Sequence, residues 1–176
     1  DIIPKLPLIF TELSGYESLR YDFWTLVSKL YIKAFPENVY NWCEKNGVKL
    51  TGHTLEEKTL FTQMSFTAGV MPFYEFEHIP GIDWLGRGIY GILPPKQLNS
   101  VAAQTGKKQT ISEMFALCGW DVNFETLMQI AECQLVNGVT LVCQHLEGYS
   151  LEGIRKRDFP PSLFYQQPWW EVYHHL

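Results

Sequence analysis

The 176-residue sequence lacks several features that would assign it to a broad class of protein. No apolar run reaches the roughly 18 residues of a membrane span, so we expect no membrane partner. Basic residues are in the minority, with 14 Lys and Arg against 19 Asp and Glu, and the only basic block is Arg155–Arg157. A net charge of −5 with no larger basic patch argues against a nucleic-acid partner.

Familiar catalytic and binding motifs are also missing. No G-x-G-x-x-G or P-loop directly follows a predicted strand, which weakens the case for nucleotide binding. The sequence has no G-x-S-x-G elbow and no H-E-x-x-H pair, which argues against a serine hydrolase and a zinc protease. The four cysteines form no C-x-x-C pair, so we expect reduced core thiols and, from these, a cytoplasmic protein.

Aromatic and apolar residues are abundant instead. Hydrophobic residues make up 46% of the chain and aromatic residues 15%, with six Trp and nine Tyr. This composition is typical of one globular domain with a sizeable core. The excess of Trp and Tyr favours a surface that stacks against ligands.

The apolar pattern predicts strands that alternate with helices. Strands are expected at Leu8–Thr11, Val48–His53, Val70–Phe76, Thr110–Phe115 and Val139–Cys143. The expected helices are a long one capped by Ser14 and Glu17 and kinked or divided at Pro36, one over Leu55–Thr67 capped by Thr54 and Glu57, one over Lys96–Gln104, and one from Asn123 to about Val136. The loop His78–Gly91 between the third and fourth strands is expected to be ordered and functional.

This alternation predicts an α/β fold with a parallel sheet. Two architectures fit the pattern, a doubly wound sheet and part of a (β/α)8 barrel. In both, the carboxyl ends of the strands share one face, where active sites form.

Each predicted strand ends near a carboxylate or an imidazole. The residues concerned include His53 and Glu56 after the second strand, Glu75 and Glu77 at the third, Glu113 in the fourth, and His145 and Glu147 after the fifth. Simpler explanations exist for some of them, since Glu57 can be a capping residue and Glu56 a solvated acid in a first helical turn. Repetition along the chain nevertheless predicts a polar site at one end of the sheet.

Glu113 lies inside the apolar run of Lys107–Trp120, so we expect burial to raise its pKa. A structural alternative is that Glu113 pairs with Arg87 or Arg155. A metal site is weakly supported, because Glu75 and Glu77 would point to opposite faces of a strand. Several carboxylates among many Trp and Tyr fit sugar chemistry better, since glycoside hydrolysis requires two carboxyl groups across the scissile bond.

Four segments resemble bacterial glycoside hydrolases that are similar to α-L-rhamnosidases. These segments are TGHTLEE (51–57), FYEFEHIPGIDWLGRG (73–88), PPKQLNSVAAQTGKKQTISEMFALCGWDVNFETL (94–127) and LVCQHLEGYSLEGIRKRDFPPSLFYQQPWW (141–170). The resemblance runs from about Ser18 to Trp170 and implies a large multidomain enzyme with a (β/α)8 catalytic barrel. It also implies an inverting mechanism with two glutamates, and calcium is the only cofactor that it suggests.

By position, the resemblance assigns the catalytic roles to Glu113 and to Glu56 or Glu57. Sugar-binding roles are expected for His53, Glu75, Asp83, Trp84, Trp120 and His145. Because a barrel needs about 250 residues, we expect the chain (1–176) to be a partial barrel that lacks at least its first strands. Such a fragment would expose open edges and self-associate. The rival hypothesis is a non-catalytic carbohydrate-binding or structural fragment.

Overall fold

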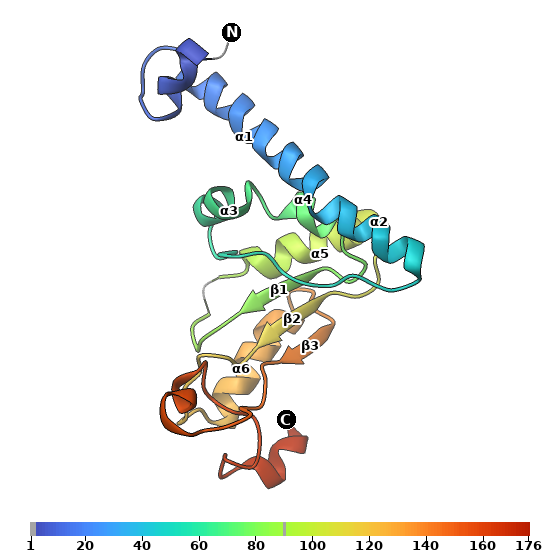
Figure 1. The fold of residues 1–176 in the computed structure, drawn as a ribbon. Coiled ribbons are helices and arrows are strands. Elements are labelled where there is room, and N and C mark those ends of the chain that lie inside the picture. Colours follow the sequence, from blue (N-terminus) through green and yellow to red (C-terminus); the bar gives the residue numbers. More distant parts are fainter. Residues whose placement is uncertain (1–2, 90) are drawn as a thin grey trace.

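A computed structural model of the protein describes residues 3–89 and 91–176. It is a mixed α/β structure around a three-stranded parallel sheet that does not close (Figure 1). In chain order the elements are the 3-10 helix η1 (Ile3–Ile9), α1 (Tyr16–Ala34), α2 (Pro36–Asn46), α3 (Leu60–Thr67), α4 (Met71–Tyr74), β1 (Gly81–Trp84), α5 (Leu93–Thr105), β2 (Ile111–Met114), α6 (Phe124–Leu135), β3 (Leu141–Gln144), and the 3-10 helices η2 (Gly153–Arg157) and η3 (Trp170–His175).

The strands lie in sequential order, with β2 between β1 and β3. Asp83 of β1 is in register with Glu113 of β2, which in turn is in register with Cys143 of β3. A further parallel bridge joins Thr51 to Ile79, which places the segment before α3 beside the start of β1. With this segment included, the parallel order follows the sequence without a reversal.

The two faces of the sheet differ. Ile82, Trp84 and Met114 are buried in one apolar core with residues of α5 and α6, and Ser112 donates a hydrogen bond to Gln134 of α6. Because side chains alternate along a strand, Asp83 and Glu113 project from the opposite face. Both of these carboxylates are only partly buried, so the helices cover one face and the acidic residues lie on the other.

The predicted parallel sheet is confirmed, and two of its strands were correctly placed. The segments Thr110–Phe115 and Val139–Cys143 contain or overlap β2 and β3. Asn123 caps α6 by accepting a hydrogen bond from Thr126 N, as expected, and Pro36 divides α1 from α2. Gly47 ends α2 with a left-handed backbone, the conformation that glycine adopts at little cost.

Three predicted strands are wrong. Val70–Phe76 contains the helix α4, because Pro72 suits a first helical turn and a short apolar run does not by itself distinguish strand from helix. The strand β1 instead comes from the predicted loop. Leu8–Thr11 overlaps the end of η1, and Val48–His53 contributes only the single bridge at Thr51.

Two predicted helix caps are also wrong. Helix α1 begins after Gly15 with no side-chain cap, so Ser14 and Glu17 form no capping box. Helix α3 begins only after Thr59, which forms the capping box with Thr62. It cannot begin near Thr54 because the Glu57 side chain is drawn into the core and Glu56 has a left-handed backbone (φ 56°).

Candidate functional site

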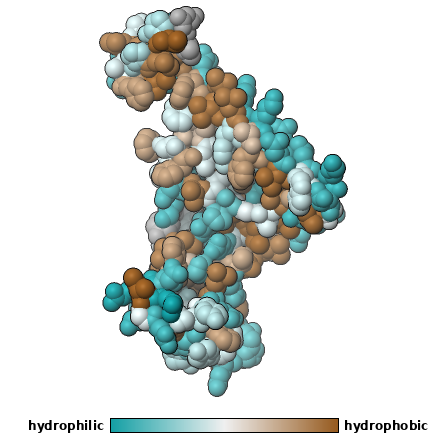
Figure 2. Space-filling model, in the orientation of Figure 1, coloured by the Kyte–Doolittle hydropathy of each residue, from teal (hydrophilic) through white to brown (hydrophobic). Residues whose placement is uncertain are grey.

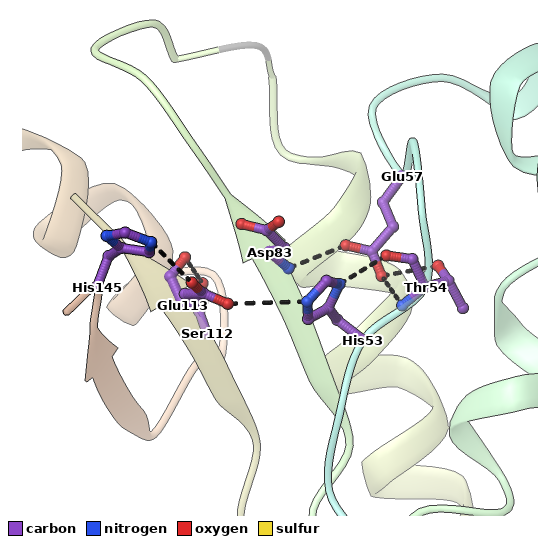
Figure 3. Close-up of polar contacts among 7 residues, drawn as sticks. All are labelled: His53, Thr54, Glu57, Asp83, Ser112, Glu113 and His145. Carbon is purple, nitrogen blue, oxygen red and sulfur yellow. Dashed lines mark hydrogen bonds and ion pairs between the residues drawn. The ribbon is translucent and has the colours of Figure 1, made fainter. Parts of the chain in front are cut away.

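Four polar side chains meet at the carboxyl end of the sheet (Figure 3). Asp83 and Glu113 come from the third positions of β1 and β2, His145 directly follows β3, and His53 follows the bridge at Thr51. Parallel strands place their carboxyl ends at one edge, which is why residues 92 positions apart in the chain come together here. The sequence predicted all four residues as site residues, and the structure brings them together.

Glu113 lies between two imidazoles. Its Oε2 is 3.7 Å from His53 Nε2, and its Oε1 is 3.8 Å from His145 Nε2. His53 Nδ1 is 2.7 Å from the carbonyl oxygen of Thr54, so Nδ1 must carry a proton. A proton on His53 Nε2 therefore makes the ring cationic and creates an ion pair with Glu113.

The environment of Glu113 differs from the expected one. Its side chain retains 30% exposure, because its neighbours Ser112 and Met114 point into the core while Glu113 points away from it. The flanking residues are therefore buried, while this carboxylate stays partly exposed. The structural alternative, a pairing with Arg87 or Arg155, is not found among the described residues, where Glu113 contacts the two imidazoles and Arg87 binds Asp121 and the Cys118 carbonyl.

Asp83 is the more strongly perturbed carboxyl group of the site. Burial raises its pKa from 3.8 to about 6, with a further upward contribution from Glu113, while the nearby His53 opposes the rise. Its Oδ1 atom is buried and has no hydrogen-bond partner among the described residues. A carboxyl group that is half protonated at about pH 6 can act as a general acid.

Glu57, a predicted catalytic residue, is buried and fully hydrogen-bonded. Its Oε1 accepts from Thr54 N (3.1 Å), Thr54 Oγ1 (2.9 Å) and Tyr74 Oη (2.9 Å), and its Oε2 accepts from Asp83 N (3.0 Å). Burial raises its pKa against the opposing effect of these donors. Because its oxygens accept these four hydrogen bonds, Glu57 connects Asp83 of β1 to Thr54 in the loop of residues 53–58. Its role here is structural.

Glu56 has the opposite environment. It is exposed and lines a cavity of about 850 Å³ together with Glu57, Asp83, Arg87 and Phe159. This volume lies within the usual ~300–1,000 Å³ of small-molecule sites. Glu56 is therefore accessible to a ligand in this cavity in a way that Glu57 is not.

Three other predicted sugar-binding residues lie in different places. Trp84 is 4% exposed and belongs to the core, and its indole N–H donates to Gly88 O. Glu75 follows α4, where its carbonyl accepts from Lys107, a residue that precedes β2 and so lies away from the carboxyl ends. Trp120 is 37% exposed and lines a second cavity, of about 240 Å³, beside His145.

Phe159 was missed by the sequence reasoning. Its ring lies 5.9 Å from that of His145, and it lines both the 850 Å³ and the 240 Å³ cavity. Its backbone is left-handed (φ 47°), a conformation that is rare and strained for a bulky residue. Only its position before Pro160 and Pro161 could have marked it in the sequence.

A glycine-rich sequence follows the observed strand β1 and matches the dinucleotide-binding pattern. Gly86, Gly88 and Gly91 have G-x-G-x-x-G spacing between β1 and α5, a match hidden by the misplaced third strand. Phosphate binding there depends on free N–H groups at the helix start. Pro94 and Pro95 remove two of these donors, and Gly86 N donates to Ala116 O, so the match lacks the chemistry of a phosphate site.

His53, Asp83 and Glu113 could also hold a metal ion. One ligand atom from each lies within 4.8 Å of those of the other two. One nitrogen and two carboxylate donors suit a transition-metal ion better than calcium, which takes six to eight oxygen ligands. The calcium expected from the resemblance therefore does not fit these three residues alone.

No protein-family model matches the chain, and neither a curated protein nor a solved structure matches it significantly. Among residues 3–89 and 91–176, none of the helices combines the length and the apolar character that crossing a membrane requires. The function must therefore be inferred from the site itself.

Proposed function

We propose that this chain is part of the catalytic domain of a glycoside hydrolase, with Glu113 and Asp83 as its pair of carboxyl groups. The observation that carries the proposal is the register of β1 and β2, which sets these two side chains next to each other at the carboxyl end of the sheet. Glycosidases act through two carboxyl groups in different protonation states. Asp83, with a pKa of about 6, suits the acid, and we assign the second role to Glu113, which lies between two imidazoles.

We further propose that the sheet is part of a (β/α)8 barrel. Two features support this architecture over a doubly wound sheet. The parallel order from Thr51 through β1 and β2 to β3 follows the sequence, and α5 and α6 pack against the same face. A doubly wound sheet has helices on both faces and reverses its strand order. In a barrel, the face with Asp83 and Glu113 would line the interior.

The distance between carboxyl groups bears on stereochemistry. Ligand atoms of Asp83 and Glu113 lie within 4.8 Å, close to the ~5–5.5 Å separation of retaining enzymes. The inverting mechanism implied by the resemblance would need a more distant partner for Glu113, and we propose Glu56, which lines the large cavity, for that role. The anomeric configuration of the first-formed product, measured by NMR, distinguishes the two carboxyl pairs. Retention would favour Asp83 with Glu113, and inversion would favour Glu56 with Glu113.

The resemblance to α-L-rhamnosidase-like enzymes makes an α-L-rhamnoside the first substrate to examine. The test is hydrolysis of a panel of 4-nitrophenyl glycosides, including the α-L-rhamnopyranoside, by this chain and by a longer form of the protein. We expect Glu113→Gln to lower kcat by roughly 10²–10⁴-fold while circular dichroism stays unchanged. Glu75→Gln is the matched control, because Glu75 is exposed and lies away from the site.

Two outcomes would contradict the proposal. Near wild-type activity in Glu113→Gln would remove Glu113 from the chemistry. Carbohydrate binding without hydrolysis in both forms of the protein would favour the alternative, a non-catalytic carbohydrate-binding fragment. Running each assay with EDTA and with added Ca²⁺, Mn²⁺ or Zn²⁺ tests whether His53, Asp83 and Glu113 act through a metal instead.

A further inference from the structure

A second cavity lies directly beside the carboxylate site. Its volume is about 240 Å³, and it is formed by the segment that follows β3 together with Trp120 from the loop after β2. Figure 1 shows this segment, in orange to red, folded beyond the carboxyl end of the sheet. His145, which contacts Glu113, and Phe159, which also lines the larger cavity, connect the two spaces.

The loops around this cavity are fixed by hydrogen bonds. Gly119 N donates to Pro160 O (3.0 Å), which joins the loop after β2 to the segment around Phe159. Gly148 N donates to the buried Ser162 Oγ (2.8 Å), which in turn donates to Gln166 Oε1 (3.1 Å). The cavity is therefore a defined part of the fold.

Aromatic rings at this cavity are available to a ligand. The indole N–H of Trp120 donates to Lys156 O (2.7 Å), which sets the orientation of a ring that is still 37% exposed. Tyr149 is fully exposed and so has no folding role that would explain its ring. An oriented indole beside an exposed tyrosine ring suits stacking against the apolar face of a sugar ring.

Charged groups at the same cavity are unpaired. Within the described part of the chain, the side chains of Glu147, Arg155 and Asp158 make no hydrogen bond or ion pair, and all three are exposed. Acceptors and donors beside aromatic faces are the groups that bind sugar hydroxyls. With a volume below the ~300–1,000 Å³ of drug-sized sites, the cavity suits a single sugar ring.

We propose that this cavity is a second carbohydrate subsite, which binds the sugar residue next to the one held beside Asp83 and Glu113. The inference rests on the proposed function and extends it, because it makes the natural ligand a glycan of at least two residues. Phe159 and His145 then lie where the two sugar residues are joined. The larger cavity, which Asp83 lines, takes the other residue.

The experiment compares binding of disaccharides and monosaccharides. The probes are the methyl glycosides of L-rhamnose, D-glucose, D-galactose and D-mannose, and disaccharides in which each of these sugars is joined to D-glucose. Affinities are measured by NMR titration of the Glu113→Gln variant, so that no probe is hydrolysed. We expect at least one disaccharide to bind more tightly than its monosaccharide by roughly three- to tenfold.

Tyr149→Ala and Trp120→Ala should each remove this advantage and leave the monosaccharide affinity unchanged. Because Tyr149 is fully exposed, its variant folds even if the Trp120 variant does not. Trp42→Ala, at an exposed Trp of α2, is the matched control. Equal affinities for disaccharide and monosaccharide, no binding of any probe, or an advantage that survives both variants would overturn the subsite.

This outcome is separable from that of the proposed function. Disaccharide binding through Trp120 and Tyr149, without hydrolysis by either the wild-type chain or the longer form of the protein, would support the subsite and refute the hydrolase. Hydrolysis of aryl glycosides together with equal affinities for disaccharide and monosaccharide would support the hydrolase and refute the subsite.

Discussion

Among single residues, Asp83 is the group whose titration should control activity. As a general acid it must be protonated, so kcat should fall as the pH rises through about 6. His53 lowers the pKa of Asp83, and replacing it by a neutral residue removes that effect. We therefore expect the pH–rate profile of His53→Gln to fall at a higher pH than that of the wild type, while His174→Gln, an exposed residue of η3, leaves it unchanged. A downward shift in His53→Gln would contradict this assignment.

Glu77 is a buried carboxyl group outside the proposed chemistry. Only 1% of it is exposed, and burial raises its pKa from 4.5 to about 9. Between these values the folded protein keeps a proton that the unfolded chain has lost, so the free energy of unfolding falls as the pH rises through this window. Its Oε2 accepts from Gly81 N at the start of β1, while its Oε1 has no hydrogen-bond partner among the described residues.

Glu77→Gln should remove this dependence, because glutamine resembles the protonated acid and does not titrate. We expect the variant to gain stability relative to the wild type as the pH rises from 5 to 8.5, by at most ~1.4 kcal/mol per pH unit. Urea unfolding at several pH values measures the difference. Glu75→Gln, two residues away and exposed, should show no such trend. A constant difference between Glu77→Gln and the wild type would show that Glu77 is ionised in the folded protein.

At the scale of elements, helix starts offer a direct test of the observed caps. Thr59 Oγ1 accepts from Thr62 N (3.1 Å) at the start of α3, whereas Ser14 makes no cap for α1. Thr59→Ala should therefore cost about 0.5–2 kcal/mol of unfolding free energy, and Ser14→Ala should cost close to nothing. Urea midpoints of both variants against the wild type give the result. Equal losses would mean that the helix starts are misassigned.

At the scale of the whole molecule, the sheet is open and apolar side chains remain exposed. Strand β3 forms one edge of the sheet, and its Val142 is 38% exposed. Figure 2 shows further hydrophobic residues over the N-terminal part and along α1, where Phe10, Leu26 and Leu30 are exposed. An unprotected strand edge pairs readily with another chain.

We predict that the chain self-associates through the β3 edge. Val142→Lys should shift sedimentation-velocity profiles towards the monomer, because a lysine on an edge strand opposes pairing. Leu30→Glu, on α1, is the control and should leave the profiles unchanged. Dissociation by Leu30→Glu alone would place the interface on α1, and a monomeric wild-type protein would refute the prediction.

Local sequence signals determined those parts of the fold that depend on near neighbours. Asn123 predicted the start of α6, Asn46-Gly47 the end of α2, and Pro36 the break between α1 and α2, because caps and backbone restrictions act within a few residues. Strands β2 and β3 were found from short apolar runs bounded by polar residues. Of the polar residues predicted near the strand ends, His53, Glu113 and His145 do meet, together with Asp83 from the predicted loop, whereas Glu75 lies elsewhere.

Only the tertiary structure decided which carboxylates are available to a ligand. Glu56 and Glu57 are neighbours in the sequence, yet Glu57 is buried and accepts four hydrogen bonds, whereas Glu56 is exposed and lines a cavity. Glu113 points away from the core although its neighbours are apolar, and Asp83 came from a segment predicted to be a loop. Burial and strand register depend on which distant segments pack together, and residues 50–58 reach β1 only through contacts that no local pattern encodes.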